Sequence, residues 1–173
     1  MIKLINRIVS GGQTGVDRAA LDVALALGIA CGGWCPKGRR AEDGVIAATY
    51  PLIETEGRSY RQRTRLNVQD SDATLILNRG KLQGGTAYTQ QLAQKMDKPC
   101  WVVQLDAPAD PEKVMTWLRA HNVQTLNVAG PRESNCPGIH AAAFDVLRSW
   151  LSIYKDDGSE SARGSAEDHN DTR

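Results

Sequence analysis

The stretch Arg7-Ile8-Val9-Ser10-Gly11-Gly12-Gln13-Thr14-Gly15-Val16-Asp17 decides the fold. A short apolar run, which predicts a strand, leads through a glycine-rich turn into residues with helical spacing. Gly28 then predicts the end of that helix, because glycine readily adopts the left-handed conformation found there. The apolar positions that share one helix face are Val16, Ala19, Ala20, Val23 and Leu27.

A second turn of the same kind, Gly84-Gly85-Thr86, follows a predicted strand over residues 72–77. The apolar run 100–104 predicts a strand that is buried on both faces. Strands and helices alternate along the chain, which predicts an α/β, Rossmann-like fold: an open, mostly parallel sheet of about five or more strands with helices on both faces. Other strands are expected at 29–34 and 126–129, helices at 60–69, 86–96, 111–120 and 139–151, and a strand or extended segment at 51–55.

The length of 173 residues predicts a single Rossmann-like ligand-binding domain over 1–154, followed by a polar, flexible tail over 155–173. No apolar run approaches the roughly 20 residues that span a bilayer, and the first residues lack a signal-peptide pattern. We therefore expect a cytoplasmic protein without a membrane partner. Net charge is +1, and six acids fall within residues 156–173, so the body is mildly basic. This balance favours an anionic small molecule over nucleic acid.

Both glycine turns predict an anion site, because a helix N-terminus offers unpaired N–H groups and partial positive charge. Ligands of open parallel sheets bind beyond the carboxyl ends of the strands, so loops from several strands should converge there. The alternative is that the glycines only make tight turns and the arginines only form solvated faces. Arg61 and Arg65, four residues apart, would share a helix face that could hold a planar anion. The predicted binding residues are Gly11, Gly12, Gln13, Thr14, Gly15, Asp17, Lys37, Arg39, Arg40, Arg63, Gly84, Gly85, Thr86, Arg132, Glu133 and Ser134.

Several other functions are disfavoured by the same residues. The first turn lacks the spacing of the dinucleotide fingerprint, and neither turn ends in the Lys-Ser or Lys-Thr of a P-loop. No nucleophile–His–acid set is apparent. Zinc is disfavoured because the pairs Cys31/Cys35 and Cys136/His140 lack the usual spacing of zinc ligands.

The segment from Arg63 to Thr89, with Asp70-Ser71-Asp72-Ala73 and Gly84-Gly85-Thr86, resembles the nucleotide-binding superfamily of the "lonely guy" phosphoribohydrolases. The resemblance places Arg63 near that family's upstream arginine. Thr89 stands where those enzymes have a catalytic glutamate, and the proline of their glycine turn is absent. Without that carboxylate, hydrolysis by the same mechanism lacks its general acid/base.

A longer resemblance covers residues 7 to about 150. The segments 11–22, 33–44 and 126–134 resemble the "putative molybdenum carrier" family, a circularly permuted branch of the YpsA-like proteins. That resemblance implies a Rossmann-like fold, homo-oligomers and binding of the molybdenum cofactor (molybdopterin), a pterin with a phosphate and an oxo-metal group. A molybdoenzyme would receive the cofactor.

The sequence leaves two hypotheses for function. The first is a non-enzymatic carrier of the molybdenum cofactor or another nucleotide-like or phosphate anion. The alternative is a phosphoribohydrolase-like enzyme that processes a nucleotide or a nucleotide-derived metabolite. In the alternative, Asp17, Asp43 or Glu133 would replace the missing glutamate.

Overall fold

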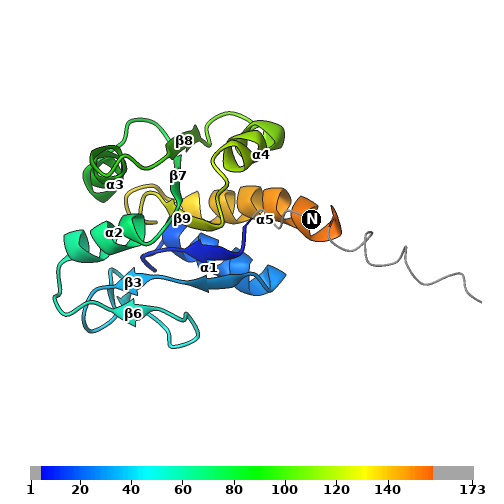
Figure 1. Cartoon of the computed structure of the whole chain (residues 1–173). Coiled ribbons are helices and arrows are strands. Elements are labelled where there is room, and N and C mark those ends of the chain that lie inside the picture. Colours follow the sequence, from blue (N-terminus) through cyan, green and yellow to red (C-terminus); the bar gives the residue numbers. More distant parts are fainter. Residues whose placement is uncertain (1–4, 158–173) are drawn as a thin grey trace, which may run out of the picture.

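The computed structural model describes residues 5–157, which build one five-stranded, wholly parallel sheet (Figure 1). The strand order is β2-β1-β9-β7-β8, so strands from the two ends of the described chain meet in the middle of the sheet. This arrangement confirms the predicted α/β, Rossmann-like class. The strands are β1 (Arg7–Val9), β2 (Ala30–Gly32), β7 (Ala73–Asn78), β8 (Cys100–Gln104) and β9 (Thr125–Ala129).

The strand expected over residues 29–34 is divided between two sheets. Residues 30–32 form β2, whereas β3 (Trp34–Cys35) pairs in parallel with β6 (Ile53–Glu54) in a separate small sheet. Gly33 allows this change of direction: its φ is +133°, and a Cβ there would lie 2.2 Å from the Ser10 carbonyl oxygen. A third pair, β4 (Arg40–Ala41) and β5 (Gly44–Val45), is antiparallel.

The helices begin and end close to the predicted residues. They are α1 (Val16–Leu27), α2 (Tyr60–Gln69), α3 (Gly84–Lys95), α4 (Pro111–Ala120) and α5 (Ile139–Asp157). Gly28 ends α1 in the left-handed conformation, and the Asp110 side chain caps α4 by accepting the Glu112 N–H. Because α5 continues to Asp157, it passes the boundary expected at residue 154, and residues 158–173 lie outside the described residues.

Both faces of the sheet are covered, as period-two alternation in a central strand requires. Ala73, Leu75 and Leu77 of β7 belong to the main apolar core, which includes buried residues of α1, α4 and α5. The intervening residues of β7, which include Ile76 and Asn78, are equally buried. Helices α2 and α3 lie on the opposite side of the sheet from α4 and α5 (Figure 1).

The expectation for residues 100–104 was wrong in one respect. They form β8 as predicted, but β8 is an edge strand and only Val103 within it is buried. The apolar run therefore marks a half-covered edge instead of the sheet centre. No helix within residues 5–157 is long and apolar enough to cross a membrane.

Candidate functional site

A cavity of about 800 Å³ opens at the carboxyl ends of β1, β7 and β9. Both glycine turns contribute to its wall: Gln13 and Asp17 belong to the first turn, and Gly84, Gly85 and Thr86 to the second. The two turns therefore share one cavity, as the sequence analysis required. The other lining residues are Tyr60, Arg61, Arg63, Thr64, Asn78, Arg79, Lys81, Gln83, Tyr88, Thr89, Ala129, Gly130, Pro131, Arg132, Asn135 and Cys136.

The second glycine turn is open toward this cavity. Gln83, the N-cap residue of α3, makes no capping hydrogen bond with its side chain. A Cβ at Gly85 would meet no atom within 4 Å, and its φ is not in the left-handed region. Nothing in the described part of the chain therefore requires glycine at position 85, whereas an anion approaching the backbone would.

Thr86 gives a second indication that the turn Gly84-Gly85-Thr86 is open to a ligand. Its side chain is buried, with 7% of the residue exposed, and it lines the cavity. Within residues 5–157 its hydroxyl makes no hydrogen bond with another protein group. Because Thr86 lines the cavity, this hydroxyl is available to a ligand there.

Two N–H groups of the first glycine turn already have partners within the protein, and the expected anion at that turn stays a prediction. The Val16 N–H, at the start of α1, donates to the Pro131 carbonyl at 3.2 Å. The close approach needs Gly15, because a Cβ there would lie 2.2 Å from the same carbonyl oxygen. The Gln13 N–H donates to the Asp17 carboxylate at 3.3 Å. A carboxylate thus takes the position expected for an anionic ligand.

Gly11 and Gly12 also serve the packing of the turn. A Cβ at Gly11 would lie 1.8 Å from Arg63 Nη1, so Gly11 makes room for that arginine. Gly12 has a φ of +74° and approaches Leu52, while its carbonyl accepts from Arg18 at 3.1 Å. Neither glycine lines the cavity.

Asp17 and Arg63 form a buried ion pair at the cavity wall, with 3.2 Å between Asp17 Oδ2 and Arg63 Nη1. Burial raises the pKa of Asp17 above its ordinary value, although the charges of Arg63 and Arg132 act in the opposite direction. Two further buried atoms in lining residues, Gln13 Oε1 and Arg63 Nε, have no hydrogen-bond partner among residues 5–157. Such unpaired polar atoms are uncommon in folded proteins and concentrate at functional sites.

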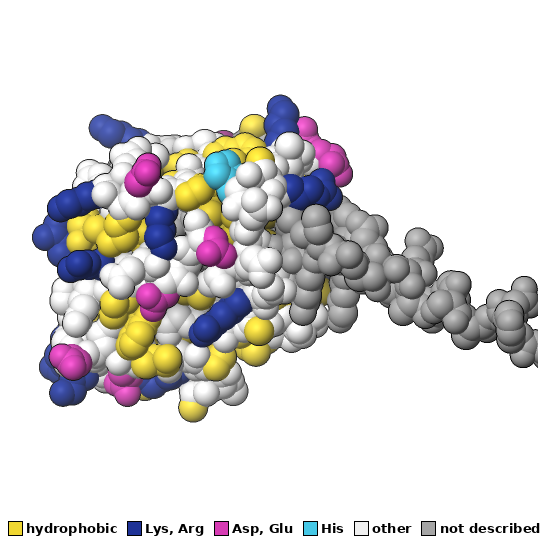
Figure 2. All heavy atoms as spheres, viewed as in Figure 1, with side chains coloured by type: hydrophobic (Ala, Val, Ile, Leu, Met, Phe, Trp, Pro, Cys, Tyr) yellow, Lys and Arg dark blue, Asp and Glu magenta, His cyan; other side chains and the backbone are white. Residues whose placement is uncertain are grey.

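The cavity is strongly basic. Its lining carries one carboxylate, that of Asp17, against the five cations of Arg61, Arg63, Arg79, Lys81 and Arg132. Arg132 lies over the Tyr60 ring at 4.5 Å, and Arg61 over Tyr88 at 4.7 Å. Figure 2 shows Lys and Arg side chains gathered around an apolar patch on the side of α2 and α3.

Tyr60 and Tyr88 also line the cavity and were not predicted from the sequence. In the sequence, these tyrosines are marked only by neighbouring basic or glycine-rich residues, which is a weak signal for a binding site. Arg61 lines the cavity as its predicted helix face suggested, whereas Arg65 does not.

Three predicted basic residues lie outside the lining. The Arg39 guanidinium donates to the carbonyls of Ile46, Ala47, Tyr50 and Leu52 at 2.8–3.1 Å, and so holds the segment before β6. Lys37 is exposed and does not line the cavity. Arg40 is also exposed, but its guanidinium lies 5.7 Å from the centre of the Tyr60 ring.

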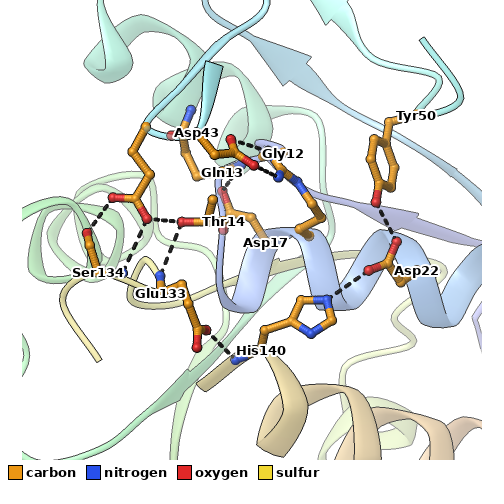
Figure 3. A network of polar contacts seen from close by, with 12 residues as sticks. Gly12, Gln13, Thr14, Asp17, Asp22, Asp43, Tyr50, Glu133, Ser134 and His140 are labelled. Carbon is orange, nitrogen blue, oxygen red and sulfur yellow. Dashed lines mark hydrogen bonds and ion pairs between the residues drawn. The ribbon is translucent and has the colours of Figure 1, made fainter. Parts of the chain in front are cut away.

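Thr14, Glu133 and Ser134 join loops together instead of lining the cavity (Figure 3). The Glu42 carboxylate accepts hydrogen bonds from the hydroxyls of Thr14 and Ser134, and these bonds lower its pKa. The Glu133 carboxylate accepts the N–H groups of Gly138 and His140 at 2.5 and 2.9 Å, at the start of α5. These side chains have protein partners and lie outside the cavity lining, and their predicted ligand contacts stay predictions.

The structure distinguishes the three carboxylates that were candidates to replace the missing glutamate, namely Asp17, Asp43 and Glu133. Glu133 stabilises the start of α5, and Asp43 forms an ion pair with Arg18. Asp17 alone of the three lines the cavity. Within residues 5–157 no three His, Cys, Asp or Glu side chains are placed to hold a metal ion, and His140 pairs with Asp22 at 2.8 Å.

Comparisons with known proteins agree with this architecture. The sequence profile of the circularly permutated YpsA SLOG family matches residues 8–151. A solved structure from Syntrophus aciditrophicus SB, described as a "putative molybdenum carrier protein", is 45% identical, with a TM-score of 0.83. The match covers 86% of this chain and 96% of that one. A search of curated proteins finds no match. The chain belongs to the circularly permutated YpsA SLOG family.

Proposed function

We propose that the protein is a non-enzymatic carrier of an anionic small molecule, and that this molecule is the molybdenum cofactor. The observation that carries the proposal is the open N-terminus of α3 in a basic cavity. Gly85 leaves room for a ligand against the backbone, and Thr86 offers a hydroxyl without a protein partner. The similar chain described as a molybdenum carrier supports the choice of ligand.

The residues present fit this cofactor chemically. The volume of about 800 Å³ lies within the range of small-molecule pockets, which is roughly 300–1,000 Å³. Backbone N–H groups and Thr86 at the start of α3 would hold the phosphate, because the helix dipole favours negative charge there. Arg63 and Arg132 would hold further oxygen atoms. When bound, the cofactor supplies an oxo-metal group whose sulfur ligands come from its own pterin.

The test is to identify and titrate the ligand. Native mass spectrometry of the purified full chain should show a copurifying molecule with the mass of the cofactor. Isolated cofactor should then bind saturably, without turnover, and Gly85→Ala should weaken that binding. Absence of saturable binding to either cofactor or inorganic phosphate would overturn the proposal.

A second candidate, an enzyme acting on a nucleotide, is favoured by one observation. Asp17 is a buried carboxyl group in the cavity wall, and its raised pKa is typical of a general acid/base. Turnover of AMP or ADP-ribose that is abolished in Asp17→Asn would support the enzyme. Turnover in neither protein, together with saturable cofactor binding, would support the carrier.

The proposal extends to the cellular setting. We place the carrier in the cytoplasm as a homo-oligomer of single-domain chains that delivers its cargo to a molybdoenzyme. Sedimentation analysis of the full chain tests the oligomeric state. Activation of a cofactor-free molybdoenzyme by the loaded protein tests the delivery.

A further inference from the structure

Three arginines surround the ring of Tyr60. Tyr60, Arg63 and Arg132 line the cavity, and Arg40 lies outside the lining. The Cζ atoms of Arg132, Arg40 and Arg63 lie 4.5, 5.7 and 6.0 Å from its centroid. They come from the loop after β9, from β4 and from α2, so three distant parts of the chain bring positive charge to one ring. The ring attracts each cation, but the three cations repel one another.

The protein neutralises this group incompletely. Among the described residues, Arg63 pairs with Asp17, whereas Arg40 and Arg132 have no carboxylate within salt-bridge distance. Glu42 is near enough for the charge of Arg132 to lower its pKa. The carboxylate oxygens of Glu42, however, already accept the hydroxyls of Thr14 and Ser134.

The loops that carry two of these arginines are tied together. Glu42 follows Arg40 in the β4–β5 hairpin, and its bonds to Ser134 fasten that hairpin to the loop of Arg132. The Arg40 carbonyl also accepts from the Gln13 side chain at 2.7 Å. The repelling charges are therefore held in place by contacts on both loops, which is the arrangement expected of a preformed anion site.

We propose that the arginines around Tyr60 form a second oxoanion subsite, separate from the start of α3, and that the ligand carries two anionic groups. This inference rests on the proposed function and deepens it: the arginines around Tyr60 would hold the second anionic group of the ligand, which is a phosphate or an oxo-metal group. Guanidinium groups suit such an anion because they donate paired N–H groups to two oxygens. Tyr60 is the platform that positions them.

Small inorganic oxoanions test the number of subsites without assuming the shape of the ligand. Equilibrium dialysis of the full chain against molybdate and against phosphate should show two bound anions per chain. Arg132→Gln should weaken one of them about tenfold or more, the effect expected from losing one charge-assisted contact. Gly85→Ala should weaken the other.

Matched variants distinguish the loss of an anion contact from unfolding and from a general loss of positive charge. Arg65→Gln removes an exposed arginine of the same helix α2, one that does not line the cavity, and should leave both anions bound. Tyr60→Phe keeps the ring and should retain the second anion, whereas Tyr60→Leu should lose it. Thermal denaturation confirms that each variant folds.

Each outcome decides between the two proposals. A single anion that depends on Gly85 but not on Arg132 would overturn the second subsite and leave the carrier intact. A single anion sensitive to both substitutions would show one merged site and would also overturn it. No saturable anion at all would overturn both proposals.

Discussion

Replacement of Gly85 by alanine separates ligand binding from stability, because the two should change in opposite directions. Gly85 is the second residue of α3, with an ordinary φ and no atom within 4 Å of a Cβ added to it. Alanine in a helix is more favourable than glycine by about 0.5–1 kcal/mol, since it loses less conformational entropy on folding. For a chain of this size that corresponds to a rise in Tm of about 1–4 °C.

The same methyl group would project into the cavity and displace an anion from the N–H groups of α3. Hydrogen bonds to a charged partner contribute about 1.5–3 kcal/mol, so we expect the Kd for phosphate or cofactor to rise about 10- to 150-fold. Calorimetric titration measures the Kd, and thermal denaturation measures the Tm. Gln91→Ala, an exposed substitution on the same helix, is the control that should leave binding unchanged.

Two results would refute this reasoning in different ways. Unchanged affinity in Gly85→Ala would show that the ligand does not approach the start of α3. A fall in both Tm and affinity would show that the glycine is needed by the protein itself, contrary to the open space around it.

Three further predictions concern residues with structural roles. Arg39→Met should lower the free energy of unfolding by about 2–4 kcal/mol, because four backbone carbonyls lose a charged donor, and phosphate affinity measured beside urea denaturation should stay unchanged. Glu133→Ala should lower stability by about 1 kcal/mol through loss of the contacts at the start of α5, again without loss of phosphate binding; a larger effect on binding than on stability would contradict the structural role. Because burial raises the pKa of Asp17, its folded carboxyl retains a proton that the unfolded chain releases above pH 3.8. Its contribution to stability is therefore full below that pH and is lost as the pH rises through the folded-state pKa. The difference in unfolding free energy between wild type and Asp17→Asn, measured by urea titration across pH, should fall over this window, and a difference that rises with pH would contradict the assignment.

The sequence determined the local elements well because their signals are local. Apolar spacing marked α1, and the caps Gly28 and Asp110 marked helix ends, since each acts through hydrogen bonds within one turn. It also placed both glycine turns beside one cavity, because parallel strands present their carboxyl ends to the same edge. The family resemblance, read from three segments, agrees with the profile match over residues 8–151.

Only the tertiary structure decided which of those residues line the cavity. The two glycine turns look alike in sequence, but the Pro131 carbonyl and the Asp17 carboxylate accept from N–H groups of the first, whereas no atom of the described residues lies within 4 Å of a Cβ added at Gly85 in the second. Arg39 and Arg132 are the same residue type, yet one donates to four carbonyls and the other lies over Tyr60 in the cavity wall. The difference arises because a donor's partner is set by which distant loop packs against it, and sequence spacing carries no information about that contact.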